Sequence, residues 1–181
     1  MIRLFDIIFS AICLLIFLPF FLTIILIIFF NSGIPIFYIS KRVGLSGKNF
    51  TIFKFRTMEN HNNEQPTKIG LYLRRTSLDE TLQFINILKG DMSFVGPRPL
   101  PDYLNNKISS DKLKQRQSVR PGLTGLSQIN YNGKQRLLEE KVDLDLKMIK
   151  NFRLIDYFNI IILTIPVIFK RFYYNVKGKT L

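Results

Sequence analysis

The chain has 181 residues, a formal net charge of +13, one cysteine and one histidine. This length predicts one domain, or one domain with a membrane segment. One cysteine and one histidine exclude a disulfide framework, cysteine-based zinc sites and sites built from several histidines, so acid–base and metal chemistry fall to carboxylates. Residues 1–30 carry only Arg3 and Asp6, so the positive excess lies in residues 31–181 and indicates anionic partners.

The first element is an uncharged apolar segment from Ile7 to Phe30, about 24 residues or roughly 36 Å as a helix. It is too long for a signal peptide and lacks a small-residue cleavage site, so we expect a membrane helix. Pro19 divides it into halves of about 12 residues, each reaching part-way through a ~30 Å hydrocarbon core. A broken helix that enters and leaves on one face and a kinked spanning helix fit equally well. Basic residues soon after the segment place the body in the cytoplasm: Lys41, Arg42, Lys48, Lys54 and Arg56.

A small β-hairpin is expected over residues 34–56, because two runs rich in β-branched and aromatic residues flank a glycine-containing turn. In its second strand Phe53 and Phe55 alternate with Lys54 and Arg56, which gives one apolar and one basic face. That basic face either binds phosphate or is a charged edge toward solvent or lipid. Residues 59–70 are polar and turn-rich, and predict a mobile loop, a candidate lid.

The centre of the sequence is an acidic pair, Asp79 and Glu80, preceded by Arg74 and Arg75. Ser77 is of a residue type that is favoured at a helix N-cap, and apolar residues follow at helical spacing: Leu78, Leu82, Ile85 and Leu88. The acids therefore fall in the first turn of a short helix, where the macrodipole favours negative charge. Adjacent carboxylates among cations suit phosphoryl chemistry. A capping box, in which Glu80 bonds back to the backbone of Ser77, accounts for the same residues.

Two further arginines are held on stiff segments. Arg98 lies between prolines in Gly96-Pro97-Arg98-Pro99, and Arg120 precedes Pro121-Gly122. Each arginine is either a structural anchor or a phosphate ligand, and two of them after one acidic helix favour a phosphate pocket.

Three more helices are expected in the second half of the chain. Residues 105–117 form a polar surface helix, and residues 139–150 form a charged helix with an apolar stripe at Val142, Leu146 and Ile149. An apolar run within about 155–172 is too short to span a bilayer and contains Pro166. With Lys170 and Arg171 at its end, it predicts an amphipathic helix lying on the membrane interface.

Taken in this order, the motifs resemble the monotopic phosphoglycosyl transferases, also called the bacterial sugar transferase family, in its small single-domain form. The matching motifs lie in residues 53–58, 77–80, 88–99 and 119–125. The resemblance implies a mainly α structure with a small β-hairpin (α+β), a proline-broken re-entrant helix in residues 1–32, and a cytoplasmic catalytic domain in residues 33–181. It places that domain on the cytoplasmic face of the bacterial inner membrane.

The resemblance also implies a reaction: transfer of a sugar 1-phosphate from a UDP-sugar to a polyprenol phosphate, typically undecaprenyl phosphate, with release of UMP. Asp79 would be the nucleophile, and Glu80, with Asp79, would hold Mg²⁺. The cations assigned to phosphate are Lys54, Arg56, Arg74, Arg75, Arg98 and Arg120. The expected partners are membrane lipid and downstream glycosyltransferases of the same pathway, without nucleic acid. The rival hypothesis is a non-enzymatic, membrane-anchored basic module that binds anionic lipid or nucleic acid.

Overall fold

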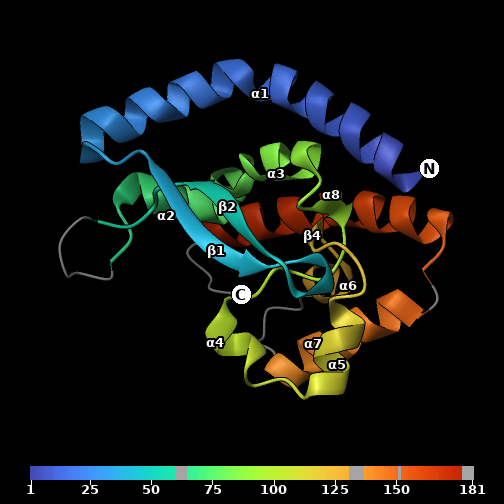
Figure 1. Cartoon of the computed structure of the whole chain (residues 1–181). Coiled ribbons are helices and arrows are strands. Elements are labelled where there is room, and N and C mark those ends of the chain that lie inside the picture. Colours follow the sequence, from blue (N-terminus) through green and yellow to red (C-terminus); the bar gives the residue numbers. More distant parts are fainter. Residues whose placement is uncertain (60–64, 131–136, 151, 177–181) are drawn as a thin grey trace.

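The computed structural model describes residues 1–59, 65–130, 137–150 and 152–176. It is mainly helical with two small two-stranded sheets, which confirms the expected fold class of helices with a β-hairpin (Figure 1). The helices are α1 Ile2–Ser32, α2 Lys68–Thr76, α3 Gln83–Lys89, α4 Asp102–Asn105, α5 Ser110–Arg116, α6 Leu126–Ile129, α7 Leu138–Lys150 and α8 Leu154–Val176. The strands are β1 Phe37–Val43, β2 Asn49–Phe55, β3 Ser93–Val95 and β4 Gly122–Thr124, and the 3₁₀ turns are η1 Leu45–Gly47 and η2 Leu78–Glu80.

Helix α1 arches over the body as one bent helix, with Pro19 inside it (Figure 1). The sequence left open a helix broken at Pro19 and a kinked helix, and the family resemblance implied the broken form; the structure shows one continuous bent helix. The hydroxyl of Thr23 donates to the Pro19 carbonyl at 2.9 Å, and proline-associated bends of this kind are usual in long helices. Phe21, Ile24 and Ile28 face the body and are buried, while many apolar side chains on the rest of the helix are exposed. An apolar surface of that extent is typical of a helix that associates with a membrane.

Polar contacts fix both ends of α1 to the same body. At the N-terminal end, buried Asp6 accepts hydrogen bonds from Ser93 Oγ (3.0 Å), the Phe94 N–H (3.0 Å) and Tyr157 Oη (2.7 Å). At the other end, the guanidinium of Arg56 donates to the carbonyl of Ser32 at 2.5 Å. A buried polar group needs such partners, so these bonds determine where the helix rests.

The hairpin was predicted correctly: β1 and β2 are antiparallel, with Phe37 opposite Phe55 and Val43 opposite Asn49. The predicted loop over residues 59–70 is shorter than expected, because α2 already begins at Lys68, with Thr67 capping its first turn. Residues 60–64 of that loop lie outside the described residues.

The predicted helix start at Ser77 is wrong. Ser77 has a left-handed backbone (φ 60°, ψ 16°), ends α2, and makes no side-chain capping bond. The acids therefore lie in the three-residue turn η2, and α3 begins only at Gln83. The expected apolar stripe is thus divided between η2 and α3, and Asp79 is buried.

A short parallel pair, β3 and β4, was not predicted from the sequence. It brings the Gly96-Pro97-Arg98-Pro99 segment beside the Gly122 strand, and the Gly122 N–H donates to the Pro97 carbonyl at 2.9 Å. A Cβ on Gly122 would lie 2.0 Å from the Gly96 nitrogen, so this approach requires glycine. The proline segment is non-helical, as expected.

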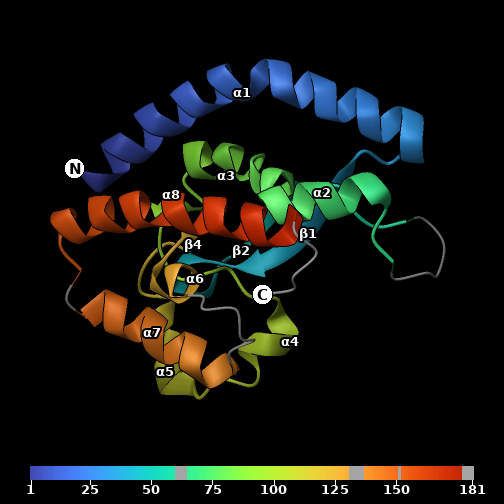
Figure 2. The ribbon, with the colours of Figure 1, turned by 180° about the vertical axis from the view of Figure 1, so that it is seen from behind.

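The polar helix expected over residues 105–117 is confirmed only in part, because α4 ends at Asn105 and the next helix, α5, begins at Ser110 and ends at Arg116. Helix α7 matches the charged helix predicted over 139–150. Of its predicted apolar stripe Val142 is buried and Leu146 and Ile149 are half-buried, and Asp145 and Met148 are buried beside them. Helix α8 covers the predicted interfacial segment and crosses the side of the body seen in Figure 2, in contact with α2, α6 and β3.

Candidate active site

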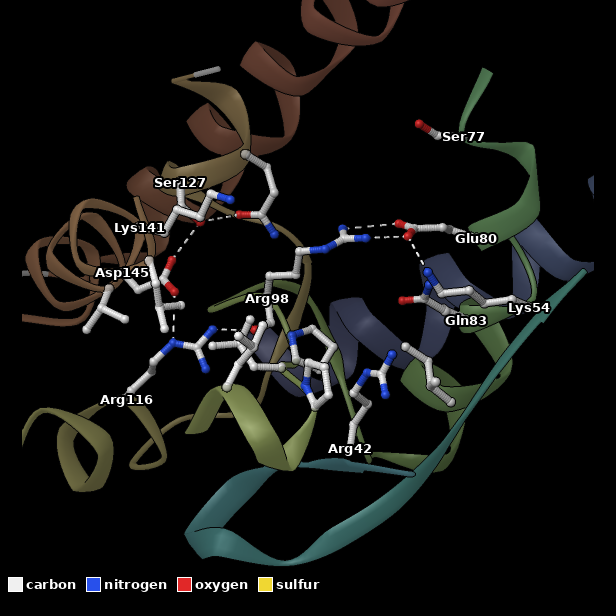
Figure 3. Close-up of a pocket in the computed structure, with 18 of the residues that line it drawn as sticks. Arg42, Lys54, Ser77, Glu80, Gln83, Arg98, Arg116, Ser127, Lys141 and Asp145 are labelled. Atoms are coloured by element: carbon white, nitrogen blue, oxygen red, sulfur yellow. Dashed lines mark hydrogen bonds and ion pairs between the residues drawn. The ribbon is translucent and has the colours of Figure 1, made fainter. Parts of the chain in front are cut away.

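A cavity of about 560 Å³ lies between η2, the hairpin, the proline segment and helices α4–α7, and contains both predicted acids. This volume is in the usual range for small-molecule sites. Figure 3 shows Arg98 extending across the cavity, with Glu80, Lys54 and Gln83 at one end and Arg116, Asp145 and Ser127 at the other. The charged side chains that line it are Arg42, Lys54, Arg74, Asp79, Glu80, Arg98, Arg116, Lys141 and Asp145.

Glu80 is the most strongly paired acid of the cavity. Its Oε1 lies 2.6 Å from Lys54 Nζ, and its carboxylate accepts a two-pronged contact from Arg98, with Nη1–Oε2 at 3.2 Å and a second bond between Nη2 and Oε1. Burial alone would raise the pKa of Glu80, but Arg98 and Lys54 together lower it to about 2. Because both oxygens bind these cations, the capping-box interpretation of Glu80 is wrong.

Asp79 differs from its neighbour in its partners. It is 8% exposed, and in the described part of the chain no donor hydrogen-bonds its carboxylate. Burial, and then the charge of Glu80, raise the pKa of Asp79 to about 6, against the opposing effect of Lys54, Arg74 and Arg98. The expected helix N-terminus that would favour the charge of Asp79 is absent, because η2 has only three residues, and burial raises the pKa instead. A carboxyl with this pKa is mostly ionised at neutral pH.

Three of the six cations assigned to phosphate line the cavity with the acids: Lys54, Arg74 and Arg98. Arg74 is held there by a 2.8 Å bond from its Nε to Thr57 Oγ1.

The other three lie elsewhere. Arg56 is buried against the C-terminal end of α1, where it bonds backbone carbonyls, and Arg75 is exposed on α2 outside the cavity lining. Arg120 donates to the Gly90 carbonyl at 2.9 Å and lines a separate cavity with Arg3. All six cations lie in or next to the sequence motifs, so position in the sequence did not show which of them reach the cavity.

Sequence reasoning missed one end of the cavity. Arg116 and Asp145 form a buried ion pair there, with Nε–Oδ2 at 2.9 Å, and Ser127 Oγ lies 2.8 Å from Asp145 Oδ1. Arg42 also lines the cavity from β1. The available signal was Asp145 itself, an acid in register with the apolar stripe of α7, which is rare without a buried partner.

The acids can supply part of a magnesium site. Mg²⁺ binds through one or two carboxylates together with substrate phosphates and water, and two adjacent carboxylates meet that need. Among the described residues no group of three or more His, Cys, Asp or Glu side chains could hold a metal ion alone. Asp79 and Glu80 are therefore the residues of the cavity that could hold a divalent ion, with further oxygens from the substrate.

Comparison with known proteins identifies the family of the chain. A model of the bacterial sugar transferase family matches residues 1–171. The chain is 40% identical to the uncharacterized sugar transferase EpsL of Bacillus subtilis, over 74% of this chain and 69% of that protein. It is 33% identical to the exopolysaccharide production protein ExoY of Rhizobium meliloti, over 92% of this chain and 84% of that protein.

A longer relative carries a specific activity in its name. The chain is 35% identical to the UDP-glucose:undecaprenyl-phosphate glucose-1-phosphate transferase of Escherichia coli, over 88% of this chain but 38% of that protein. The match to the family model covers nearly the whole sequence, including the acidic pair and the proline segment. The chain therefore belongs to the bacterial sugar transferase family.

Proposed function

We propose that this protein transfers a sugar 1-phosphate from a UDP-sugar to a polyprenol phosphate such as undecaprenyl phosphate, releasing UMP, through a covalent aspartyl intermediate. The observation that carries the proposal is the contrast within the acidic pair: Glu80 is fixed by two cations, while no described residue hydrogen-bonds the carboxylate of Asp79 in the same charged cavity. Relatives named as glucose-1-phosphate and N-acetylgalactosamine-phosphate transferases to undecaprenyl phosphate support this substrate class.

The first step is attack by an Asp79 oxygen on the phosphorus that bears the sugar. A new O–P bond forms, and the bond from that phosphorus to the bridging oxygen breaks, so UMP leaves with the bridging oxygen. An oxygen of the polyprenol phosphate then attacks the same phosphorus and releases the Asp79 carboxylate. Both steps exchange one P–O bond for another and need no redox partner.

The cations would neutralise the negative charges of the carboxylate and the phosphates that these steps bring together. Arg98 and Lys54 converge on the Glu80 carboxylate, near enough to Asp79 to act on its pKa, and would neutralise the phosphate oxygens in the transition state. Arg74 adds a positive charge on the η2 side of the cavity. Mg²⁺ held by Asp79 and Glu80 would supply charge neutralisation of the diphosphate.

The contacts at the two ends of α1 support a re-entrant placement. A helix that crossed the bilayer would have its ends on opposite faces, about 30 Å apart. Here Asp6 and Ser32, near opposite ends of α1, both bond to side chains of the body that follows it. Exposed apolar side chains on α8, including Leu163 and Phe169, suit an interfacial position on the same face. We place that body on the cytoplasmic face, where the UDP-sugar comes from water and the acceptor from lipid.

The proposal is tested by incubating the purified protein with Mg²⁺ and a panel of UDP-sugars without acceptor, followed by intact-protein mass measurement. We expect a mass increase equal to one sugar phosphate, together with UMP. Asp79→Asn should lose the adduct, and Asp143→Asn, which changes an exposed acid outside the cavity, should keep it. UMP release that occurs only with acceptor, without any adduct, would refute the covalent step.

A further inference from the structure

Arg98 reaches Glu80 from a segment that few regular hydrogen bonds hold. The residues on either side of it are prolines, which have no N–H to donate. Upstream, the Gly96 N–H and the Pro97 carbonyl are bonded to the β4 strand. The carbonyl of Arg98 itself accepts a short hydrogen bond from Nη2 of Arg116. The backbone position from which the Arg98 side chain starts therefore depends on Arg116.

Arg116 is itself fixed by two other elements. It is 6% exposed at the end of α5, and its Nε bonds Asp145 of α7, which is 1% exposed. The second oxygen of Asp145 lies 2.8 Å from the hydroxyl of Ser127 in α6. Figure 3 shows these three side chains together at the end of the cavity opposite Glu80.

A buried ion pair of this kind does little for net stability, because removing two charges from water offsets most of their attraction. Its effect is on orientation: a guanidinium has a planar fork of donors, so the bond to Asp145 determines the direction of the remaining Nη2. That nitrogen then holds the Arg98 carbonyl.

We infer that the Arg116–Asp145 pair is a positioning device that holds the backbone of Arg98 so that its guanidinium reaches Glu80 beside Asp79. The inference rests on the proposed function, since it assigns these residues to the same sugar-phosphate transfer. Neither residue of the pair need touch the reacting atoms.

The test compares Arg116→Lys and Asp145→Asn with a matched pair on the same helices. Lys112 and Asp143 also join α5 to α7, at 2.6 Å, but this pair is exposed and does not contact Arg98. Misplacement of a catalytic group by about 1 Å costs on the order of 100-fold in rate. We expect kcat for UMP release to fall about 10- to 100-fold in either Arg116→Lys or Asp145→Asn, with a smaller change in KM, and to stay at the wild-type value in Lys112→Gln and Asp143→Asn.

A double-mutant cycle separates positioning from general structural damage. If Arg116 acts through Arg98, then Arg116→Lys should lower kcat little further in an Arg98→Ala background. Equal losses in both backgrounds, or a wild-type kcat in Arg116→Lys, would overturn the inference. Absence of sugar-phosphate transfer by the wild-type protein would instead refute the proposed function.

Discussion

Replacement of Asp79 by Asn should make the protein more stable while it abolishes the chemistry. The pKa of Asp79 is raised from 3.8 to about 6 in the folded protein, chiefly by burial. Folding therefore opposes ionisation of this carboxyl, and the cost is present whenever the group is charged. Asn has nearly the shape of the protonated acid but cannot ionise. The variant thus keeps the packing and removes the cost.

The expected gain in unfolding free energy follows from the pKa shift of Asp79. At about 1.36 kcal/mol per pKa unit, the change from 3.8 to about 6 corresponds to about 3 kcal/mol of unfolding free energy. The size of the effect depends on pH: below about 3.8 both states are protonated and the two proteins are equally stable, whereas above about 6 the wild type has lost the full amount. For a chain of this length, about 3 kcal/mol raises Tm by about 6 to 12 °C.

The assay is thermal unfolding in detergent micelles with a metal chelator, at pH 4 and at pH 8. We expect Asp79→Asn to unfold at a clearly higher temperature at pH 8 and close to the wild type at pH 4. Asp143→Asn, at an exposed position, controls for loss of one negative charge. An Asp79→Asn protein that is no more stable than the wild type at pH 8, or that gains equally at both pH values, would refute the burial argument.

Three further outcomes follow from the same contacts. In metal-free protein with ¹³Cγ-labelled aspartate, the resonance of Asp79 is the one that is absent from Asp79→Asn. It should titrate near pH 6, and its midpoint should fall in Glu80→Gln, because the charge of Glu80 raises the pKa of Asp79. A midpoint near pH 4 in the wild type would contradict this expectation. Adding Mg²⁺ should raise the Tm of the wild type more than that of Asp79→Asn, and equal increases would place the ion elsewhere. Asp6→Leu should lower the unfolding free energy by about 3 kcal/mol or more although it adds an apolar residue to an apolar helix, because it leaves the buried hydroxyls of Ser93 and Tyr157 and the Phe94 N–H without an acceptor. Thermal unfolding would show this loss, and an unchanged or higher Tm would mean that these donors find other partners.

The sequence alone predicted those elements that depend on the spacing of residues a few positions apart. The uncharged run of α1, the alternation in β2 and the apolar stripe of α7 each follow from side-chain periodicity. The acidic pair and the rigid proline segment were also identifiable, because residue type and adjacency are enough to indicate that chemistry. The three-residue strands β3 and β4 were missed because so short a segment has no detectable period.

Tertiary structure alone decided the electrostatics of the site. The sequence offered six cations for phosphate, and the fold brought three of them to the acids while it used Arg56 to hold the end of α1. Lys54 is 26 positions from Glu80, and Asp6 is 151 positions from Tyr157, so neither pairing follows from local spacing. The pKa of Asp79 was likewise beyond sequence reasoning. Residue spacing indicates which side chains share a face of one element, whereas burial and charge pairing depend on how separate elements pack.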